Sequence, residues 1–159
     1  MQRRKFLTLG AVAAASTVVA PALQAVDHRK EQPDAWKVKN VKAGDIQGVN
    51  DALKALYGTN NVEWGKNVKI KAPKVASNGG AVPVDFESKV DCESITLLQD
   101  VNPESLVAVF DQNEMTIPKY SVKVKLKQSG SVYAVIKAKD GKLYGAKQSL
   151  EVALGGCEG

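Results

Sequence analysis

The chain has 159 residues, of which 44% are hydrophobic and 25% are charged. This length and composition are typical of one globular domain with its own core, and they exclude a chain that is disordered overall. The chain contains one histidine, His28, which excludes a multi-histidine metal site and disfavours a Ser-His-Asp triad. The two cysteines, Cys92 and Cys157, are far apart in the sequence, which excludes C-x-x-C redox, haem-attachment and four-cysteine zinc motifs.

The first residues have the pattern of an export signal. Arg3 and Arg4 are followed by residues 9–22, a mildly apolar run that contains no charged residue and ends in small side chains. A basic start and a short apolar run are typical of a signal peptide, and paired arginines indicate the twin-arginine route. We therefore predict that residues 1–25 are a cleaved twin-arginine-type signal peptide and that the mature protein is periplasmic.

Part of the positive charge belongs to this signal. The formal net charge is +5, and cleavage would remove Arg3, Arg4 and Lys5. We therefore expect no nucleic-acid partner, and the apolar run is too short for a membrane span. In the remaining chain, residues 85–114 are acidic and residues 119–147 are rich in lysine. We interpret these segments as solvated faces of neighbouring strands that attract each other; the alternative is two docking patches of opposite sign.

Residues 26–65 are predicted to be an N-terminal polar segment followed by one helix. The stretch 27–44 is polar, and Asp45 is a plausible helix N-cap. Apolar residues then recur at three- and four-residue spacing: Ile46, Val49, Ala52, Leu53 and Leu56. This spacing predicts an amphipathic helix over 46–57 that ends at Gly58. We expect its apolar stripe to pack on the body of the same domain, with a partner subunit as the alternative.

From residue 66 to residue 154 the apolar period changes to two, which indicates strands. The apolar runs lie at 68–70, 82–86, 95–98, 106–110, 120–126, 132–138 and 143–154, with turn residues between them. Asp140-Gly141 predicts a type I′ hairpin turn. About seven strands at this spacing predict a mainly β chain, an immunoglobulin-like β-sandwich over residues 66–154 that carries the N-terminal amphipathic helix.

The last five residues suggest a tethered thiol. They read Gly155-Gly156-Cys157-Glu158-Gly159 and directly follow the last predicted strand. We predict that residues 155–159 form a flexible arm, with Gly155, Gly156 and Gly159 providing backbone freedom and Cys157 attaching a covalent group. A catalytic cysteine would need a fixed base, and the acidic neighbours of Cys157 disfavour a thiolate. This pattern favours a carrier over an enzyme.

Cys157 also has a second interpretation. Export would bring the chain to an oxidising compartment, where Cys92 and Cys157 could form a disulfide. The protein would then be an exported β-sandwich that acts as a binding or structural module. The residues alone support the carrier interpretation and the disulfide interpretation about equally. For Cys92 itself, our default expectation is a small buried hydrophobic side chain.

Several features together resemble the SoxY family, the carrier subunits of the periplasmic thiosulfate-oxidising (Sox) system. They are the twin-arginine-type start, the helix before the sandwich, the segment 76–84, the hairpin around Asp140-Gly141 and the terminal Gly-Gly-Cys. The family usually ends in Gly-Gly-Cys-Gly-Gly. This chain departs from that ending at Glu158, which adds bulk and charge beside the thiol.

The resemblance implies a chemistry that the residues alone do not. It implies that Cys157 carries thiosulfate as a cysteine S-thiosulfonate, with no cofactor and no catalytic residue in this chain. It also implies a heterodimer with the Z subunit of the Sox carrier. Partner enzymes would be a c-type cytochrome that joins thiosulfate to the thiol, a manganese-dependent hydrolase that releases sulfate and, where present, a sulfane dehydrogenase.

Overall fold

The computed structural model describes residues 26–153. The predicted signal, residues 1–25, lies outside the described residues, and so does the predicted arm, residues 155–159. The predicted site residues Cys157, Gly155, Gly156 and Gly159 therefore lie outside as well.

The described residues form three helices and nine strands. The helices are α2 (His28–Glu31), α3 (Pro33–Lys37) and α4 (Gln47–Tyr57). The strands are β1 (Val62–Trp64), β2 (Val68–Lys71), β3 (Val75–Ala76), β4 (Val82–Ser88), β5 (Cys92–Gln99), β6 (Leu106–Asp111), β7 (Lys119–Val124), β8 (Gly130–Ala138) and β9 (Leu143–Val152).

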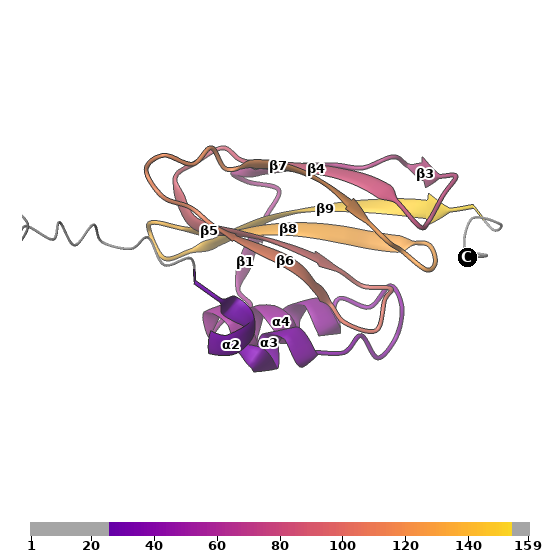
Figure 1. Ribbon diagram of the computed structural model, residues 1–159, viewed down its shortest axis with the longest axis horizontal. Coiled ribbons are helices and arrows are strands. Elements are labelled where there is room, and N and C mark those ends of the chain that lie inside the picture. Colours follow the sequence, from indigo (N-terminus) through magenta and orange to yellow (C-terminus); the bar gives the residue numbers. More distant parts are fainter. Residues whose placement is uncertain (1–25, 154–159) are drawn as a thin grey trace, which may run out of the picture.

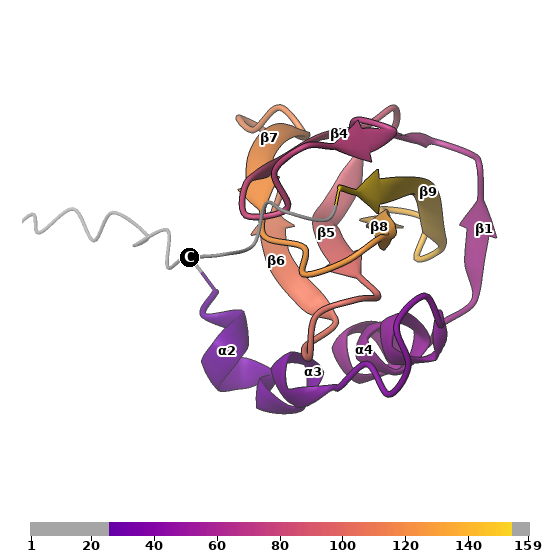
Figure 2. The ribbon, with the colours of Figure 1, turned by 90° about the vertical axis from the view of Figure 1, so that its right-hand side faces the viewer.

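The strands build two sheets, and the helices form a third layer (Figure 1). The larger sheet has six strands in the order β1-β9-β8-β5-β6, with β3 paired to β9 off this path. The smaller sheet has the order β2-β4-β7 and covers one face of the larger sheet. The helices lie along the other face, as the end-on view in Figure 2 also shows. The predicted mainly β sandwich with an N-terminal helix is confirmed.

Strand β8 is the centre of the molecule because it is buried on both faces. Val132, Ala134 and Ile136 point into the core between the two sheets. Tyr133 and Val135 point to the opposite face, where they join a second core under the helices. This division follows from the alternation of side chains along a strand.

The predicted apolar helix packs on the body of its own domain. α4 buries Val49, Ala52, Leu53 and Leu56 against Leu98, Tyr133 and Leu143 of the larger sheet. The N-cap position is Ile46 rather than Asp45, so the helix begins one residue later than predicted. Asp45 still supports this end, because its Oδ1 accepts a hydrogen bond from the Gln47 N–H at 3.0 Å. Gly58 ends the helix in the left-handed conformation (φ 76°).

Four short elements were not predicted from the sequence. α2 and α3 lie in the stretch expected to be merely polar, and their single buried residue is Ala35. Such short helices contain too few apolar side chains to show a helical period. β1 and β3 each pair in parallel with β9, and these pairings join residues distant in the sequence. The described residues therefore contain nine strands rather than about seven.

The turn at Asp140-Gly141 is not the predicted type I′ turn. Type I′ requires a positive φ at both central residues, and only Gly141 has one (φ 83°). The Gly141 N–H donates to the Ala138 carbonyl at 2.9 Å, and the Ala138 N–H donates to the Lys142 carbonyl at 3.0 Å. This is a three-residue hairpin loop with glycine in the left-handed position, a common alternative to the two-residue turn.

Candidate functional site

The last described strand is held on both sides up to its end. The Glu151 N–H donates to the Lys74 carbonyl at 2.8 Å, and the Ala153 N–H donates to the Ala76 carbonyl at 3.0 Å. On the other side, the Val152 N–H donates to Ser129 Oγ at 2.9 Å. The position from which the chain continues toward Cys157 is therefore fixed. Figure 1 shows β3 and the arrowhead of β9 at this same end of the sandwich.

We call this end of the sandwich the exit end; besides β3 and the end of β9, it comprises loop 77–80 and connection 125–129. The loop is ordered by Asn78, whose Oδ1 accepts the Gly80 N–H at 2.8 Å. The Gly79 carbonyl accepts the Leu126 N–H at 2.8 Å, which ties the loop to the connection. The start of the segment 76–84, on which the family resemblance partly rests, thus borders the exit end.

A buried carboxylate supports the exit end from inside. Asp100 is fully buried (0% exposed). Its Oδ1 accepts the Ser131 N–H at 2.8 Å, and its Oδ2 accepts the Tyr133 hydroxyl hydrogen at 2.8 Å. The pKa of the Tyr133 hydroxyl is raised far above its ordinary value, mainly by burial and to a smaller extent by the Asp100 carboxylate. Tyr133 therefore remains a neutral donor, and the bonds fix the start of β8.

Position 130 requires glycine, because the backbone there lies too close to the side chains of Asp100 and Val101 for any Cβ atom. A Cβ atom at Gly130 would lie 2.1 Å from Val101 Cγ1 and 2.6 Å from Asp100 Oδ1. The sequence pattern placed turn residues between the predicted strands but gave no indication of Asp100. No local signal marks Asp100, since its partners lie about thirty positions further along the chain.

Cys92 lies at the opposite end of the sandwich, which we call the hairpin end. It begins β5 and pairs with Ala138, next to the β8–β9 turn. The thiol is free and only 4% exposed. Burial raises the pKa of the Cys92 thiol, and the neighbouring Asp91 raises it further. The default expectation of a small buried side chain is confirmed.

The two ends are too far apart for Cys157 to reach Cys92. Along β8, Ala138 lies opposite Cys92, whereas Gly130 lies opposite Leu150 near the exit end. At ~3.3 Å per strand residue these positions are ~26 Å apart. The four residues from Ala153 to Cys157 span at most ~14 Å. An intramolecular disulfide would therefore require β9 to leave the sheet.

Cys92 is expected to be unreactive in the folded protein. Its burial and raised pKa both reduce the fraction of accessible thiolate. Titration with a thiol-specific chromogenic disulfide at pH 8 should modify one cysteine per native chain, and the second only after denaturation. Peptide mapping should place the native modification on Cys157. Rapid native labelling of Cys92 would contradict this assignment.

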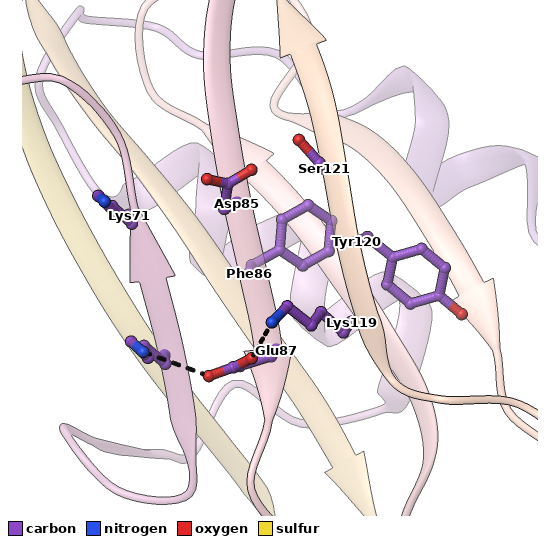
Figure 3. Close-up of a pocket in the computed structure, with 8 residues that line it drawn as sticks. Lys71, Asp85, Phe86, Glu87, Lys119, Tyr120 and Ser121 are labelled. Atoms are coloured by element: carbon purple, nitrogen blue, oxygen red, sulfur yellow. Dashed lines mark ion pairs between the residues drawn. The ribbon is translucent and has the colours of Figure 1, made fainter.

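The smaller sheet contains a hollow that is the alternative candidate site (Figure 3). It is lined by residues of β2, β4 and β7: Lys69, Lys71, Asp85, Phe86, Glu87, Lys119, Tyr120 and Ser121. Glu87 lies 3.4 Å from the ammonium groups of both Lys69 and Lys119. The bond from Lys119 is the main reason why the pKa of the Glu87 carboxyl is lowered. These pairs agree with the interpretation of mutually attracting strands and show no arrangement of reactive groups.

Metal-binding clusters and membrane-spanning helices were both absent from residues 26–153. This part of the chain contains no group of three or more histidine, cysteine, aspartate or glutamate side chains that could hold a metal ion. None of its helices is long and apolar enough to cross a membrane.

A family model described as "Sulfur oxidation protein SoxY" matches residues 53–157. This range covers more than half of the chain and includes Cys157. The chain belongs to the SoxY family. The resemblance inferred from the sequence is thereby confirmed, as is the sandwich fold that it implied. No curated protein matches the chain in sequence.

Among solved structures, the sulfur carrier protein SoxY from Chlorobium limicola f. thiosulfatophilum is similar to this chain. It is 28% identical, with a TM-score of 0.60, and the match covers 65% of this chain and 90% of that chain. A superoxide reductase (neelaredoxin) from Ignicoccus hospitalis is 20% identical, with a TM-score of 0.48, and covers 55% of this chain and 80% of its own. A putative superoxide reductase from Thermotoga maritima is 16% identical, with a TM-score of 0.48, and the match covers 58% of this chain and 94% of that chain. Because both TM-scores are below 0.5, the similarity to the two reductases indicates nothing about the function of this chain.

Proposed function

We propose that this chain is a covalent sulfur carrier, in which Cys157 holds thiosulfate-derived groups for partner enzymes. The main support combines the extent of the family match with the burial of the other thiol. The matched range extends to Cys157, whereas Cys92 is buried at the hairpin end. The similar structure from Chlorobium limicola is itself a sulfur carrier protein.

Loading would form one sulfur–sulfur bond. The Cys157 thiol and thiosulfate would combine to a cysteine S-thiosulfonate, with release of one proton and two electrons. A c-type cytochrome partner would accept the electrons. A manganese-dependent hydrolase partner would then add water at the outer sulfur and release sulfate, which leaves a persulfide on Cys157. A sulfane dehydrogenase, where present, would oxidise the remaining sulfur.

In this proposal the chain itself supplies no catalytic group. The single histidine, His28, is part of α2, and its Nε2 lies 2.8 Å from an Asp111 carboxylate oxygen. A nucleophilic cysteine needs a base held at hydrogen-bond distance, and His28 is already engaged in this contact. Activation of Cys157 would therefore come from partner active sites. We further propose that the chain forms a heterodimer with the Z subunit and acts in the periplasm after twin-arginine export.

The test is the intact mass of the protein purified from periplasm without reductant. The expected mass is that of a chain lacking residues 1–22 or 1–25, plus a thiosulfate or sulfur adduct that reductant removes. Peptide mapping should place the adduct on the peptide that contains Cys157. A chain two hydrogens short of its reduced mass, with Cys92 and Cys157 linked, would overturn the proposal in favour of the stapled module.

A further inference from the structure

Four lysines at the hairpin end have acidic partners. The four ion pairs are Lys66–Glu63 at 3.7 Å, Lys119–Glu87 at 3.4 Å, Lys137–Glu93 at 2.9 Å and Lys139–Asp91 at 4.0 Å. All four pairs are near the start of β9 or the start of β5, away from the exit end. The charges within these four pairs largely cancel, so each pair contributes little net field toward an approaching protein.

The exit end carries exposed lysines without such partners. We call four of them the exit lysines: Lys74, Lys123, Lys125 and Lys127. All four are exposed, and none forms an ion pair with another residue in the range 26–153. Two exposed acidic residues lie near them: Glu151, opposite Val75 on β9, and Asp85, two positions from the partner of Lys123 on β4. The rim around the end of β9 is therefore predominantly positive.

The fold brings these four lysines together from separate segments. The Lys74 carbonyl accepts the Glu151 N–H at the end of β9. Lys123 lies opposite Pro83 near the start of β4. Lys125 and Lys127 are both held by Asn102, whose side chain bonds the Lys125 carbonyl at 2.6 Å and the Lys127 N–H at 3.2 Å. All three segments border the exit end.

The short chain length between Ala153 and Cys157 determines which surface of this protein a partner enzyme must approach. Cys157 is four residues beyond Ala153, so its Cα can lie at most ~14 Å from the Cα of Ala153. An enzyme that takes Cys157 into its active site must bring the mouth of that site to within this distance of the exit end. The exit lysines would then face the rim of that mouth.

We propose that the exit lysines form a docking rim for acidic surfaces around the active-site entrances of the enzymes that process the carrier. This inference rests on the proposed function. Exposed rim charges act mainly on the rate of encounter, which they raise by steering opposite charge. The exposed Val75 (59% exposed) on β3 directly follows Lys74 and provides an apolar contact beside the exit lysines, as protein interfaces commonly combine apolar and polar contacts.

An alternative role for the exit lysines is to bind the anionic cargo rather than the partner. The two roles differ in what they affect. A docking rim changes the carrier's kcat/KM with partner enzymes and leaves the reaction of Cys157 with small anionic reagents unchanged. A cargo site changes the small-molecule reaction.

The test compares two charge-matched variants of the mature chain in its complex with the Z subunit. The exit variant carries Lys74→Gln, Lys123→Gln, Lys125→Gln and Lys127→Gln. The control carries Lys66→Gln, Lys119→Gln, Lys137→Gln and Lys139→Gln at the hairpin end. The assay is thiosulfate-dependent cytochrome c reduction with the purified partner enzymes, with the carrier varied, at NaCl from about 20 to 300 mM. Reaction of Cys157 with an anionic chromogenic disulfide is measured in parallel.

For the exit variant, kcat/KM is expected to fall about tenfold at low salt, and its dependence on salt to flatten. The control should resemble the unmodified protein, and the thiol reaction should be unchanged in both. Equal losses in both variants, or no loss in either, would overturn the docking rim. A change confined to the small-molecule reaction would overturn it in favour of a cargo site. If the unmodified protein carries no adduct at Cys157, the proposed function itself fails and this inference fails with it.

Discussion

Replacing Cys157 with serine is expected to abolish both covalent loading and thiosulfate-dependent electron release. The serine hydroxyl cannot form the sulfur–sulfur bond, so no S-thiosulfonate can form. Because Cys157 lies beyond the last described strand, the substitution should leave the melting temperature unchanged. Intact mass and cytochrome c reduction with the partner enzymes measure the two effects.

The matched control for this substitution is Cys92→Ala. Cys92 behaves as a small buried side chain, so its replacement should cost about 1 kcal/mol of unfolding free energy and leave loading intact. The two cysteine variants should therefore separate function from stability. Residual adduct on the Cys157→Ser protein, or loss of loading in Cys92→Ala, would contradict the assignment of Cys157 as the carrier thiol.

The largest effect on stability is expected from Asp100→Ala. This substitution removes the acceptor of two hydrogen bonds, from the Ser131 N–H and from the Tyr133 hydroxyl, and leaves both donors buried. A hydrogen bond to a charged group contributes ~1.5–3 kcal/mol, so the pair predicts a loss of ~3–6 kcal/mol. Equilibrium unfolding in urea, monitored by tryptophan fluorescence, gives the free energy.

Tyr133→Phe is the companion variant for Asp100. It removes the hydroxyl donor and leaves the Ser131 bond in place, so the expected loss is about half that of Asp100→Ala. If Asp100→Ala costs less than Tyr133→Phe, the carboxylate does not stabilise the start of β8 in the way described. A full loss of folding in Asp100→Ala would be resolved by Asp100→Asn, which retains one acceptor oxygen.

The family and the main strands were predictable because their signals are local. Alternation along residues 132–138 assigned Ala134 and Tyr133 to opposite faces, and the structure places them in two different cores. The three- and four-residue spacing of Val49, Leu53 and Leu56 predicted α4 for the same reason. The turn at Asp140-Gly141 was located correctly but assigned the wrong type, because loop length depends on the register of the whole hairpin.

Local sequence patterns were enough to predict the fold class, the family and the position of a cysteine near the end of the chain. The three-dimensional fold was needed to place Cys92 and the end of β9 at opposite ends of the sandwich. The fold also joined Asp100 to Tyr133, and it showed that lysines such as Lys137 at the hairpin end have acidic partners whereas the exit lysines have none within residues 26–153. The reason is physical: periodicity depends on neighbours within one element, whereas strand pairing and burial depend on contacts between residues far apart in the chain.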